Sequence, residues 1–464
     1  MKDRYQLAII GAGPAGLTAA TTAAAGGLEV ALFDEQPAPG GQIYRAIESA
    51  DEAQKRRLGN EYRRGQGLAE AFQSSGCDYF PGTRVWSLSR RREIGLTRGG
   101  ESRFVSAGRV LVAVGAVERP VPFPGWTLPG VMHAGAAQIL FKAHRIVPSD
   151  GLVLAGSGPL LLLLAWQLMH AGVSIQALLD VAPLTNYLHA LPKLPRALLA
   201  RHYITKGLAY KKDLKLAGVK SIHNISDLRA IGQDRLVEIS FRKGGVSQRM
   251  TTDLLLTHFG VVPNTALTRV AGCDHEWHRS QRCWRPTRDE WGNTSVEGIL
   301  VAGDDAAIGG ARTAEHAGRL AACEVLYALQ QIDRRQRDRL ARDDRRWMRE
   351  ELHIRPFLEG MFRIPDRILQ VPDDETLVCR CEEVTAGRIR QAVADGHRDS
   401  NQVKFITRCG MGACQGSQCS NAVAHVVAAA TGQGIESVGH YRQRPPVKPL
   451  NLGELASLYP EEQE

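Results

Sequence analysis

Apolar and polar positions along the chain fall into blocks that predict repeated strand–turn–helix units. The apolar run Tyr5–Ile10 leads directly into a glycine-rich turn, and an alanine-rich helical stretch, Leu17–Ala25, follows it. A second apolar run, Glu29–Phe33, ends at Asp34. Short apolar runs next to glycine punctuation indicate buried strands of a parallel sheet, with the helix as the crossover between them. The pattern therefore predicts an α/β fold.

The turn after the first strand, Gly11-Ala12-Gly13-Pro14-Ala15-Gly16, has the spacing of a dinucleotide-binding loop of the Rossmann kind. Gly11 permits the tight turn, Gly13 lets the backbone approach a pyrophosphate, and Gly16 lets helix and strand pack closely. The free N–H groups at the helix N-terminus then face the phosphates. Asp34, which lies 23 residues after Gly11, is placed to accept hydrogen bonds from ribose hydroxyls.

Three later segments favour FAD over NAD as the ligand of this loop. Pro39–Gln42 brings a glycine pair near the pyrophosphate, Arg109–Gly115 resembles the strand and turn that close an FAD domain, and Thr294–Asp304 resembles the C-terminal FAD motif. A helix predicted over Thr313–Leu326 would direct its N-terminus at the flavin and stabilise the reduced anion. The expected FAD-binding residues are Gly11, Gly13, Pro14, Ala15, Gly16, Asp34, Glu35, Gly41, Gln42, Val85, Gly115, Gly303, Asp304 and Thr313.

A second unit of the same kind runs from Leu152 to Asp180. Its glycine loop is Gly156-Ser157-Gly158, but Leu161 stands where the third glycine of the fingerprint belongs. Because leucine there hinders close packing of helix on strand, we expect a scaffold that no longer binds NAD(P)H, and another nucleotide stays open as its ligand. The segments where disulfide reductases carry a cysteine pair, residues 40–47 and 151–220, contain no cysteine, which excludes that mechanism.

The segment Pro183–Gly218 is basic, rich in leucine and punctuated by proline. Its leucines recur at roughly helical spacing, for which core packing is the simpler interpretation and a partner-facing surface the alternative. They are Leu188, Leu191, Leu194 and Leu198.

Composition indicates an ordinary soluble α/β protein of 464 residues, long enough for about three domains. No apolar run reaches the ~18 residues of a membrane-spanning helix, and Met1–Arg4 passes into a strand without a signal-peptide pattern. The net charge of +9 is scattered, and the alternating charges of Asp333–Glu351 indicate a solvated helix. Without an RNA-binding signature, no nucleic-acid partner is expected.

Cysteines near the C-terminus carry the most specific chemistry of the sequence. Cys379 and Cys381 form a C-x-C pair, and after 32 residues Cys414 and Cys419 form a C-x4-C pair. Thiolates spaced in this way suit a soft metal centre, and a [2Fe–2S] cluster takes four of them. Cys409 precedes a flexible glycine-containing turn and is the expected non-ligand. Structural zinc, which favours C-x2-C pairs, is the weaker alternative.

This order of motifs resembles the FAD-containing α subunits of opine oxidases, heteromeric D-hydroxyproline and proline dehydrogenases, and hydrogen cyanide synthase. The resemblance covers nearly the whole chain and implies FAD, a [2Fe–2S] cluster and a C-terminal domain similar to bacterioferritin-associated ferredoxin. It implies Cys379, Cys381, Cys414 and Cys419 as cluster ligands, since the position of Cys409 is not a required cysteine in that group.

The resemblance also implies a division of labour between subunits. A β subunit related to D-amino-acid and sarcosine oxidases would remove hydride from a carbon–nitrogen bond, and a small ferredoxin-like γ subunit is a further expected partner. This chain would pass the electrons to a quinone or another acceptor. The sequence offers no convincing general base or nucleophile, and His133, His258 and His316 are interpreted as packed or solvated side chains. We expect a cytoplasmic protein that is peripheral at the inner membrane through its partners or acceptor.

The expected architecture is a two-dinucleotide-binding-domain flavoprotein followed by a small α-helical [2Fe–2S] domain. An FAD domain spans residues 1–120 and 265–330, around an inserted NAD(P)-like domain at 121–264. A charged linker, 331–376, leads to the cluster domain at 377–430 and a tail at 431–464. Two other functions stay open: a self-contained NAD(P)H-dependent reductase that delivers electrons through its cluster, and a redox-sensing binding protein.

Overall fold

The computed structural model of the protein describes residues 1–459 and has two large sheets, of which the first is mixed and the second parallel. The first sheet has the strand order β3-β2-β1-β6-β5-β4, with β19 beside β6. Strands β3, β2, β1, β6 and β19 run parallel, whereas β4 and β5 form an antiparallel meander with the first half of β6. Their bounds are β1 (Arg4–Ile10), β2 (Val30–Phe33), β3 (Asp78–Phe80), β4 (Thr83–Leu88), β5 (Glu93–Arg98), β6 (Glu101–Val112) and β19 (Ile299–Val301).

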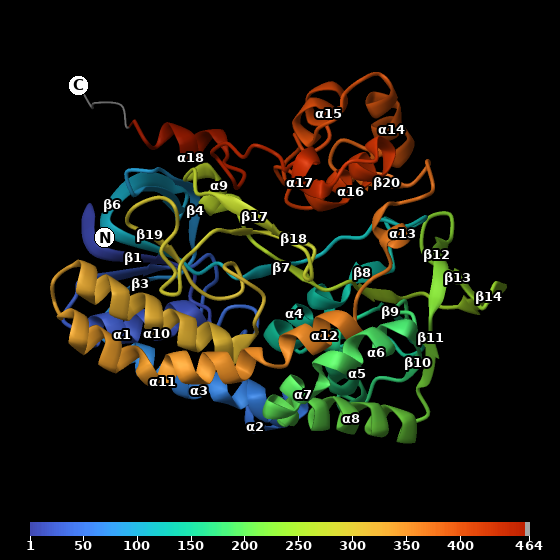
Figure 1. Ribbon diagram of the computed structural model, residues 1–464, viewed down its shortest axis with the longest axis horizontal. Coiled ribbons are helices and arrows are strands. Elements are labelled where there is room, and N and C mark those ends of the chain that lie inside the picture. The colour runs from blue at the N-terminus through green and yellow to red at the C-terminus, as the bar shows by residue number, and fades with distance from the viewer. Residues whose placement is uncertain (460–464) are drawn as a thin grey trace.

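Two helices, α1 (Pro14–Ala25) and α10 (Ala311–Ala328), lie side by side against this sheet (Figure 1). They approach closely because Gly318 has no side chain: a Cβ there would lie 2.2 Å from the carbonyl oxygen of Ala15. The Thr18 hydroxyl also donates a hydrogen bond to the Glu315 carbonyl at 3.0 Å. Each helix follows a strand of the same parallel set, so both N-termini lie at the carboxyl edge of the sheet, where such folds bind ligands.

The second sheet is parallel throughout, with the order β11-β10-β9-β15-β8. An antiparallel meander, β12-β13-β14, flanks it, and the ribbon β7-β16 joins the two domains. The parallel strands in both large sheets, with helices as their crossovers, confirm the predicted α/β class. The bounds are β7 (Ala116–Glu118), β8 (Val131–His133), β9 (Leu152–Gly156), β10 (Ile175–Asp180), β11 (Lys220–His223), β12 (Ile225–Ile231), β13 (Glu238–Lys243), β14 (Val246–Thr251), β15 (Leu255–His258) and β16 (Val261–Pro263).

The remaining elements of these two domains are helices and one hairpin. Helix α11 packs along α10, begins in a capping box at Asp333, and is mostly exposed, as the alternating charges predict. The bounds are α2 (Glu52–Leu58), α3 (Asn60–Gln73), α4 (Ala134–His144), α5 (Pro159–His170), α9 (Ala266–Val270), β17 (His275–His278), β18 (Cys283–Pro286), α11 (Arg334–Leu352), α12 (Arg355–Met361) and α13 (Asp366–Leu369).

The leucine-rich segment is helical, but the expectation that its leucines pack in the core is wrong. Leu188, Leu191 and Leu198 are exposed and Leu194 is half-buried. The small side chains on the opposite side face the protein instead, because the segment packs against α12 through alanine. Its elements are α6 (Thr185–Ala190), the 3₁₀ turns η1 (Leu191–Lys193) and η2 (Leu198–Ala200), α7 (Leu194–Ala197) and α8 (Arg201–Leu216).

The C-terminal residues form a separate helical lobe, drawn in red at the upper right of Figure 1. The lobe has its own core, in which Cys379, Cys409, Cys419 and Tyr441 are buried. Its bounds are β20 (Leu377–Cys379), β21 (Val384–Thr385), α14 (Ala386–Ala394), α15 (Ser400–Thr407), α16 (Ser420–Thr431) and α17 (Ile435–Val438).

Beyond this lobe the chain returns to the first domain, so the described part of the expected tail is packed. The Val447 N–H donates to the Trp86 carbonyl at 2.9 Å. After it, α18 (Leu452–Ala456) lies near β6, and Glu454 forms an ion pair with Arg84 at 2.6 Å. Across residues 1–459, no helix combines the length and apolarity that crossing a bilayer requires.

The tight contact between α1 and α10 predicts that replacing a helical glycine by alanine destabilises the protein at Gly318 but not at Gly67. Gly318→Ala should lower the free energy of unfolding by about 2 kcal/mol, since an overpacked methyl forces the helices apart. Gly67→Ala on α3, where a Cβ would meet nothing within 4 Å, should leave stability unchanged or raise it by up to about 1 kcal/mol. Thermal unfolding of both variants measures this, and a stable Gly318→Ala protein would contradict the packing.

Candidate functional site

The first glycine loop combines two packing glycines with one that faces open space. A Cβ on Gly11, whose φ is +107°, would lie 2.4 Å from the Ala113 carbonyl oxygen, and one on Gly16 would lie 1.9 Å from the Gly11 carbonyl oxygen. A Cβ on Gly13 would meet only the Gly41 Cα, at 4.0 Å. Gly13 therefore exposes backbone toward the side where a pyrophosphate would bind. Pro14 begins α1, and Ala15 is buried beneath it.

Asp34 stands at the end of β2 and is fixed by two backbone donors. Its Oδ2 accepts the Ala12 N–H at 2.5 Å and its Oδ1 accepts the Gln36 N–H at 2.6 Å. Each carboxylate oxygen keeps a further lone pair, which is what a ribose hydroxyl requires. Burial raises the pKa of Asp34 above its ordinary value. Its neighbour Glu35 points elsewhere and forms an ion pair with Lys448 at 2.8 Å, so the returning chain covers this end of the site.

The C-terminal FAD motif places a second carboxylate beside the N-terminus of α10. Asp304 Oδ1 accepts the N–H groups of Gly309 and Gly310 at 2.8 and 2.9 Å, which orients the group and leaves Oδ2 without a hydrogen-bond partner among the described residues. Gly303 adopts a φ of +104° and Thr313 is buried in the first turn of the helix. The sequence-predicted residues of both motifs are thus brought to one edge of the sheet.

The neighbouring Asp305 is a site residue that the sequence reasoning missed. Its side chain is buried, and neither carboxyl oxygen has a hydrogen-bond partner among residues 1–459. Burial raises the pKa of this carboxyl well above its usual range, and the Val114 and Gly115 N–H groups nearby only partly offset that. A buried carboxyl that lacks a hydrogen-bond donor next to Gly303 fits a site where a polar ligand supplies that donor.

The other expected FAD residues lie on three different segments. Val85 lies buried in β4, and Gly115, with a φ of +70°, follows β6. Gln42 is exposed, and its carbonyl accepts a hydrogen bond from Lys142 at 3.1 Å. Lys142 comes from α4 of the second domain, and its burial lowers its pKa to about 7. No sequence signal marks this lysine, because it lies 100 residues away from the loop that it holds.

The second glycine loop lies against a histidine. A Cβ on Gly158 would come within 3.4 Å of the His258 ring, whose Nδ1 bonds to Glu118 at 2.6 Å. His258 is thus packed, as predicted, although next to a loop that resembles a phosphate site. His133 lies close to this pair, and burial lowers its pKa. The third predicted histidine, His316, bonds to Asp344 of α11 at 2.6 Å.

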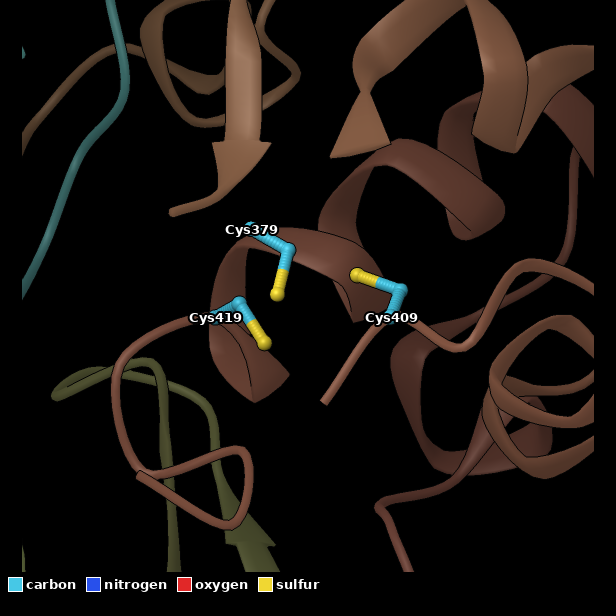
Figure 2. A group of neighbouring side chains, drawn as sticks. All are labelled: Cys379, Cys409 and Cys419. Carbon is cyan, nitrogen blue, oxygen red and sulfur yellow. The ribbon is translucent and has the colours of Figure 1, made fainter. Parts of the chain in front are cut away.

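Five thiols gather in the C-terminal lobe as an inner group and an outer pair. The sulfurs of Cys379, Cys409 and Cys419 lie within 4.8 Å of one another and converge on one point (Figure 2). Among residues 1–459 they are the only group of three or more His, Cys, Asp or Glu side chains placed so closely. The thiol of Cys381, which is exposed, faces the backbone and thiol of Cys414. Two of the four predicted ligands thus lie in the buried group and two in the outer pair. The buried group also contains Cys409, which was expected not to be a ligand.

The chemistry of the inner group suits a soft metal. The thiols of Cys409 and Cys419 act as hydrogen-bond partners that lower the pKa of Cys379 to about 2. The same contacts raise the pKa values of Cys409 and Cys419, so the group stabilises one thiolate, on Cys379, which is the ligand form of cysteine. Two glycines, Gly410 and Gly416, let the loop pack closely against the Tyr441 ring.

The strand that carries Cys379 connects the cysteine cluster to the second nucleotide domain. The Trp126 indole N–H donates to the Leu377 carbonyl at 2.7 Å. Arg380, between the two cysteines of the C-x-C pair, lies 5.3 Å above the same indole ring. Trp126 also lies 6.5 Å from the His133 ring. The cysteine loop is thus held against the second nucleotide domain.

Together the two glycine loops, Asp34, Asp304 and the paired helix N-termini define an FAD-dependent oxidoreductase with two dinucleotide-binding domains. The residues fit FAD because an open glycine backbone faces the pyrophosphate position while oriented carboxylates with free acceptor oxygens stand at both ends. The chain belongs to the pyridine nucleotide-disulphide oxidoreductase family, whose model matches residues 5–321. A second model, the sarcosine oxidase A3 domain, matches residues 373–458, which include all five thiols.

Within that class the chain belongs to the family of the opine oxidase A-subunits. It is 42% identical to the opine oxidase A-subunit of Rhizobium meliloti, over 99% of this chain and 88% of the relative. It is 31% identical to "Hydrogen cyanide synthase subunit HcnB" of Pseudomonas aeruginosa, over 97% of this chain and 98% of the relative. The structure of L-proline dehydrogenase from P. horikoshii shares the fold, with a TM-score of 0.71 and 20% identity over 98% of this chain and 79% of that chain.

The buried Asp305 predicts a pH dependence of stability. A carboxyl whose folded pKa lies above its unfolded value of 3.8 loses stabilisation as the pH rises from that value toward the folded pKa. Asp305→Asn removes the titration, so at pH 8 it should be about 1–3 kcal/mol more stable than the wild type, and the difference should shrink toward pH 5. Urea unfolding at both pH values measures it. A difference independent of pH would show that the carboxyl ionises normally.

Proposed function

We propose that this chain is the electron-transfer subunit of a heteromeric dehydrogenase or oxidase acting on amino acids, imino acids or opines. It holds FAD on the first glycine loop and a [2Fe–2S] cluster in the C-terminal lobe. Electrons arrive from a partner flavoprotein subunit of the D-amino-acid or sarcosine oxidase type and leave toward a quinone or another acceptor. The observation that carries the proposal is that five thiols gather in a chain that also brings its FAD-binding motifs to one edge of the first sheet.

The family supports the division of labour. The relatives that match over nearly their whole length carry names that describe subunits of opine oxidase and hydrogen cyanide synthase. In the proposed reaction the partner removes hydride, which is two electrons and a proton, from a carbon–hydrogen bond next to nitrogen. An imine remains, and the nitrogen proton goes to solvent. FAD, when bound, converts the electron pair to single electrons, and a [2Fe–2S] centre carries one.

The residues of this chain bind, orient and shield rather than take the substrate proton. Asp34 and Asp304 hold hydroxyl groups of the cofactor, and the N-termini of α1 and α10 stabilise negative charge on phosphate and reduced flavin. In the lobe, a two-iron cluster would take four thiolates. Cys379 and Cys419 of the inner group and Cys381 and Cys414 of the outer pair would hold it. The outer pair then lies nearer the surface, where electrons can leave.

A second candidate function is a self-contained reductase that takes electrons from NADH or NADPH. Its only support is the retained second unit, and two local features oppose it. Leu161 occupies the position of the third fingerprint glycine, and His258 lies against Gly158, where a dinucleotide needs bare backbone. In addition, Leu369 of α13 packs into the core beside Val181 and Phe259, which follow the carboxyl ends of two strands of that sheet.

The cluster ligands can be tested by single substitutions to serine. Cys379→Ser, Cys381→Ser, Cys414→Ser and Cys419→Ser should each lose most of the iron and acid-labile sulfide of the purified protein, whereas Cys409→Ser, the matched control, should keep both. The reduced proteins should differ in the same way in their electron paramagnetic resonance signal. If Cys409→Ser lost the cluster and Cys381→Ser or Cys414→Ser kept it, the buried trio would supply the ligands and this assignment would be wrong.

The reductase alternative predicts a fast reaction that the proposal does not. On anaerobic mixing of the chain with excess NADH or NADPH, the flavin absorbance at about 450 nm should stay unchanged over seconds. The assembled complex should bleach when its own amine or opine substrate is added. Bleaching of the isolated chain by either nicotinamide nucleotide at a rate typical of enzymes would favour the self-contained reductase.

A further inference from the structure

An unusual surface lies on the second domain, over the helices α6, α7 and α8 and the turns between them; we call residues 184–216 the leucine–lysine surface. Seven of the ten exposed leucines of the described chain fall in this stretch, and they are between 54 and 77% exposed. Such clustering is not the scattered exposure that ordinary surfaces show. They are Leu184, Leu188, Leu191, Leu198, Leu199, Leu208 and Leu216.

The packing of this stretch is inverted with respect to side-chain size. Ala197 and Ala200 are buried against Ile354, while the larger neighbours Leu198 and Leu199 point away from the protein. In α8 the exposed positions recur every three or four residues, which places them on one face of the helix. That face carries Arg201, Thr205, Leu208, Lys212 and Leu216. Figure 1 shows α7 and α8 at the lower edge of the molecule.

The same stretch carries most of the net charge of the protein. It contains seven lysine or arginine residues and one acidic residue, Asp213, and so holds six of the nine net positive charges. Among the described residues only Lys206 of these seven forms an ion pair, with Glu61, and Asp213 accepts the Trp166 indole N–H at 2.9 Å. The cations without an ion-pair partner among residues 1–459 are Lys193, Arg196, Arg201, Lys211, Lys212 and Lys215.

We propose that the leucine–lysine surface binds the face of a bilayer that contains anionic lipid. Leucines projecting from a helical surface enter the boundary between headgroups and acyl chains, while the interleaved lysines and arginines contact lipid phosphate. A protein partner fits less well, because the buried centres of protein interfaces are depleted in lysine and enriched in aromatic residues. The exposed positions here are mainly leucine, lysine, arginine and proline, without exposed tryptophan or phenylalanine.

This contact would place the chain directly on a membrane, whereas the sequence analysis expects an association through partners or acceptor. It does not depend on the identity of the substrate or on the cluster ligands. It also gives a physical reason why large apolar side chains remain outside the core. Without a membrane contact, each of them would expose apolar surface to water with no compensating interaction. The attraction is electrostatic and apolar together, so salt should weaken it without abolishing the apolar part.

Flotation of the full cofactor-loaded chain with lipid vesicles tests this. The protein should float with phosphatidylcholine vesicles that contain phosphatidylglycerol and hardly at all with phosphatidylcholine alone, and added salt should weaken the binding. Lys212→Gln combined with Lys215→Gln should lower the partition coefficient about 25-fold, since each basic residue near an anionic surface contributes about fivefold. Leu188→Ser combined with Leu191→Ser should lower it about tenfold or more.

Two control variants carry the same chemistry elsewhere on the surface. Arg91→Gln in the β4–β5 turn and Leu452→Ser at the start of α18 change exposed residues of the first domain and should leave partitioning unchanged. Equal binding to both vesicle types, or an equal loss in the controls, would overturn the proposal. The same holds if the Leu188→Ser, Leu191→Ser protein floats normally but no longer assembles with its partner subunit, because the surface would then be a protein interface.

Discussion

The cysteine lobe is fastened to the two nucleotide-binding domains at both of its ends. Where the chain enters the lobe, the Trp126 indole holds the Leu377 carbonyl, two residues before Cys379. Where it leaves, Val447 bonds to the backbone of β4, and Glu454 and Arg84 form a partly buried ion pair. A hydrogen-bonded, partly buried carboxylate pair contributes more than an exposed one. These contacts tie the lobe to the two nucleotide-binding domains at both ends, so the proposed cluster would not swing on a free linker.

The flavin edge is built by close backbone contacts that no other residue than glycine allows. Gly16 and Gly318 bring strand, α1 and α10 together, and the two helix N-termini then meet at one edge of the sheet. Oriented N–H groups and helix dipoles there supply positive potential without a mobile cation. Asp305 stands next to this potential as a buried carboxyl whose oxygens have no hydrogen-bond partner among the described residues.

The sequence predicted what is encoded locally. The loop from Gly11 to Gly16, the acid at Asp34, the motif ending at Asp304 and the cysteine spacing are short patterns with a direct geometric meaning, and the structure gathers the first three at one edge. Contacts between distant segments were not readable. Lys142 reaches the loop at Gln42 from another domain, and nothing in its neighbourhood signals this.

The remaining differences have a physical cause as well. Leucines at helical spacing predict burial because the apolar face of a helix usually packs against the core. The stretch around Leu198 instead packs through alanine and turns its leucines outward. The place of Cys409 depends on how the turn at Gly410 folds against Tyr441, which spacing alone does not determine. The cysteine spacing predicts a metal centre, whereas the choice of four ligands among the five thiols is a proposal that rests on pairing and on the family resemblance.

The central claim is that one chain holds a two-electron flavin and a one-electron cluster in electronic contact. Anaerobic titration of the purified full chain with dithionite, followed by visible absorbance and by low-temperature electron paramagnetic resonance, tests it most directly. The account predicts uptake of three electrons per chain, two by the flavin and one by a paramagnetic iron–sulfur centre. Uptake of two electrons without an iron–sulfur signal, or a purified chain that contains zinc in place of iron and sulfide, would contradict it.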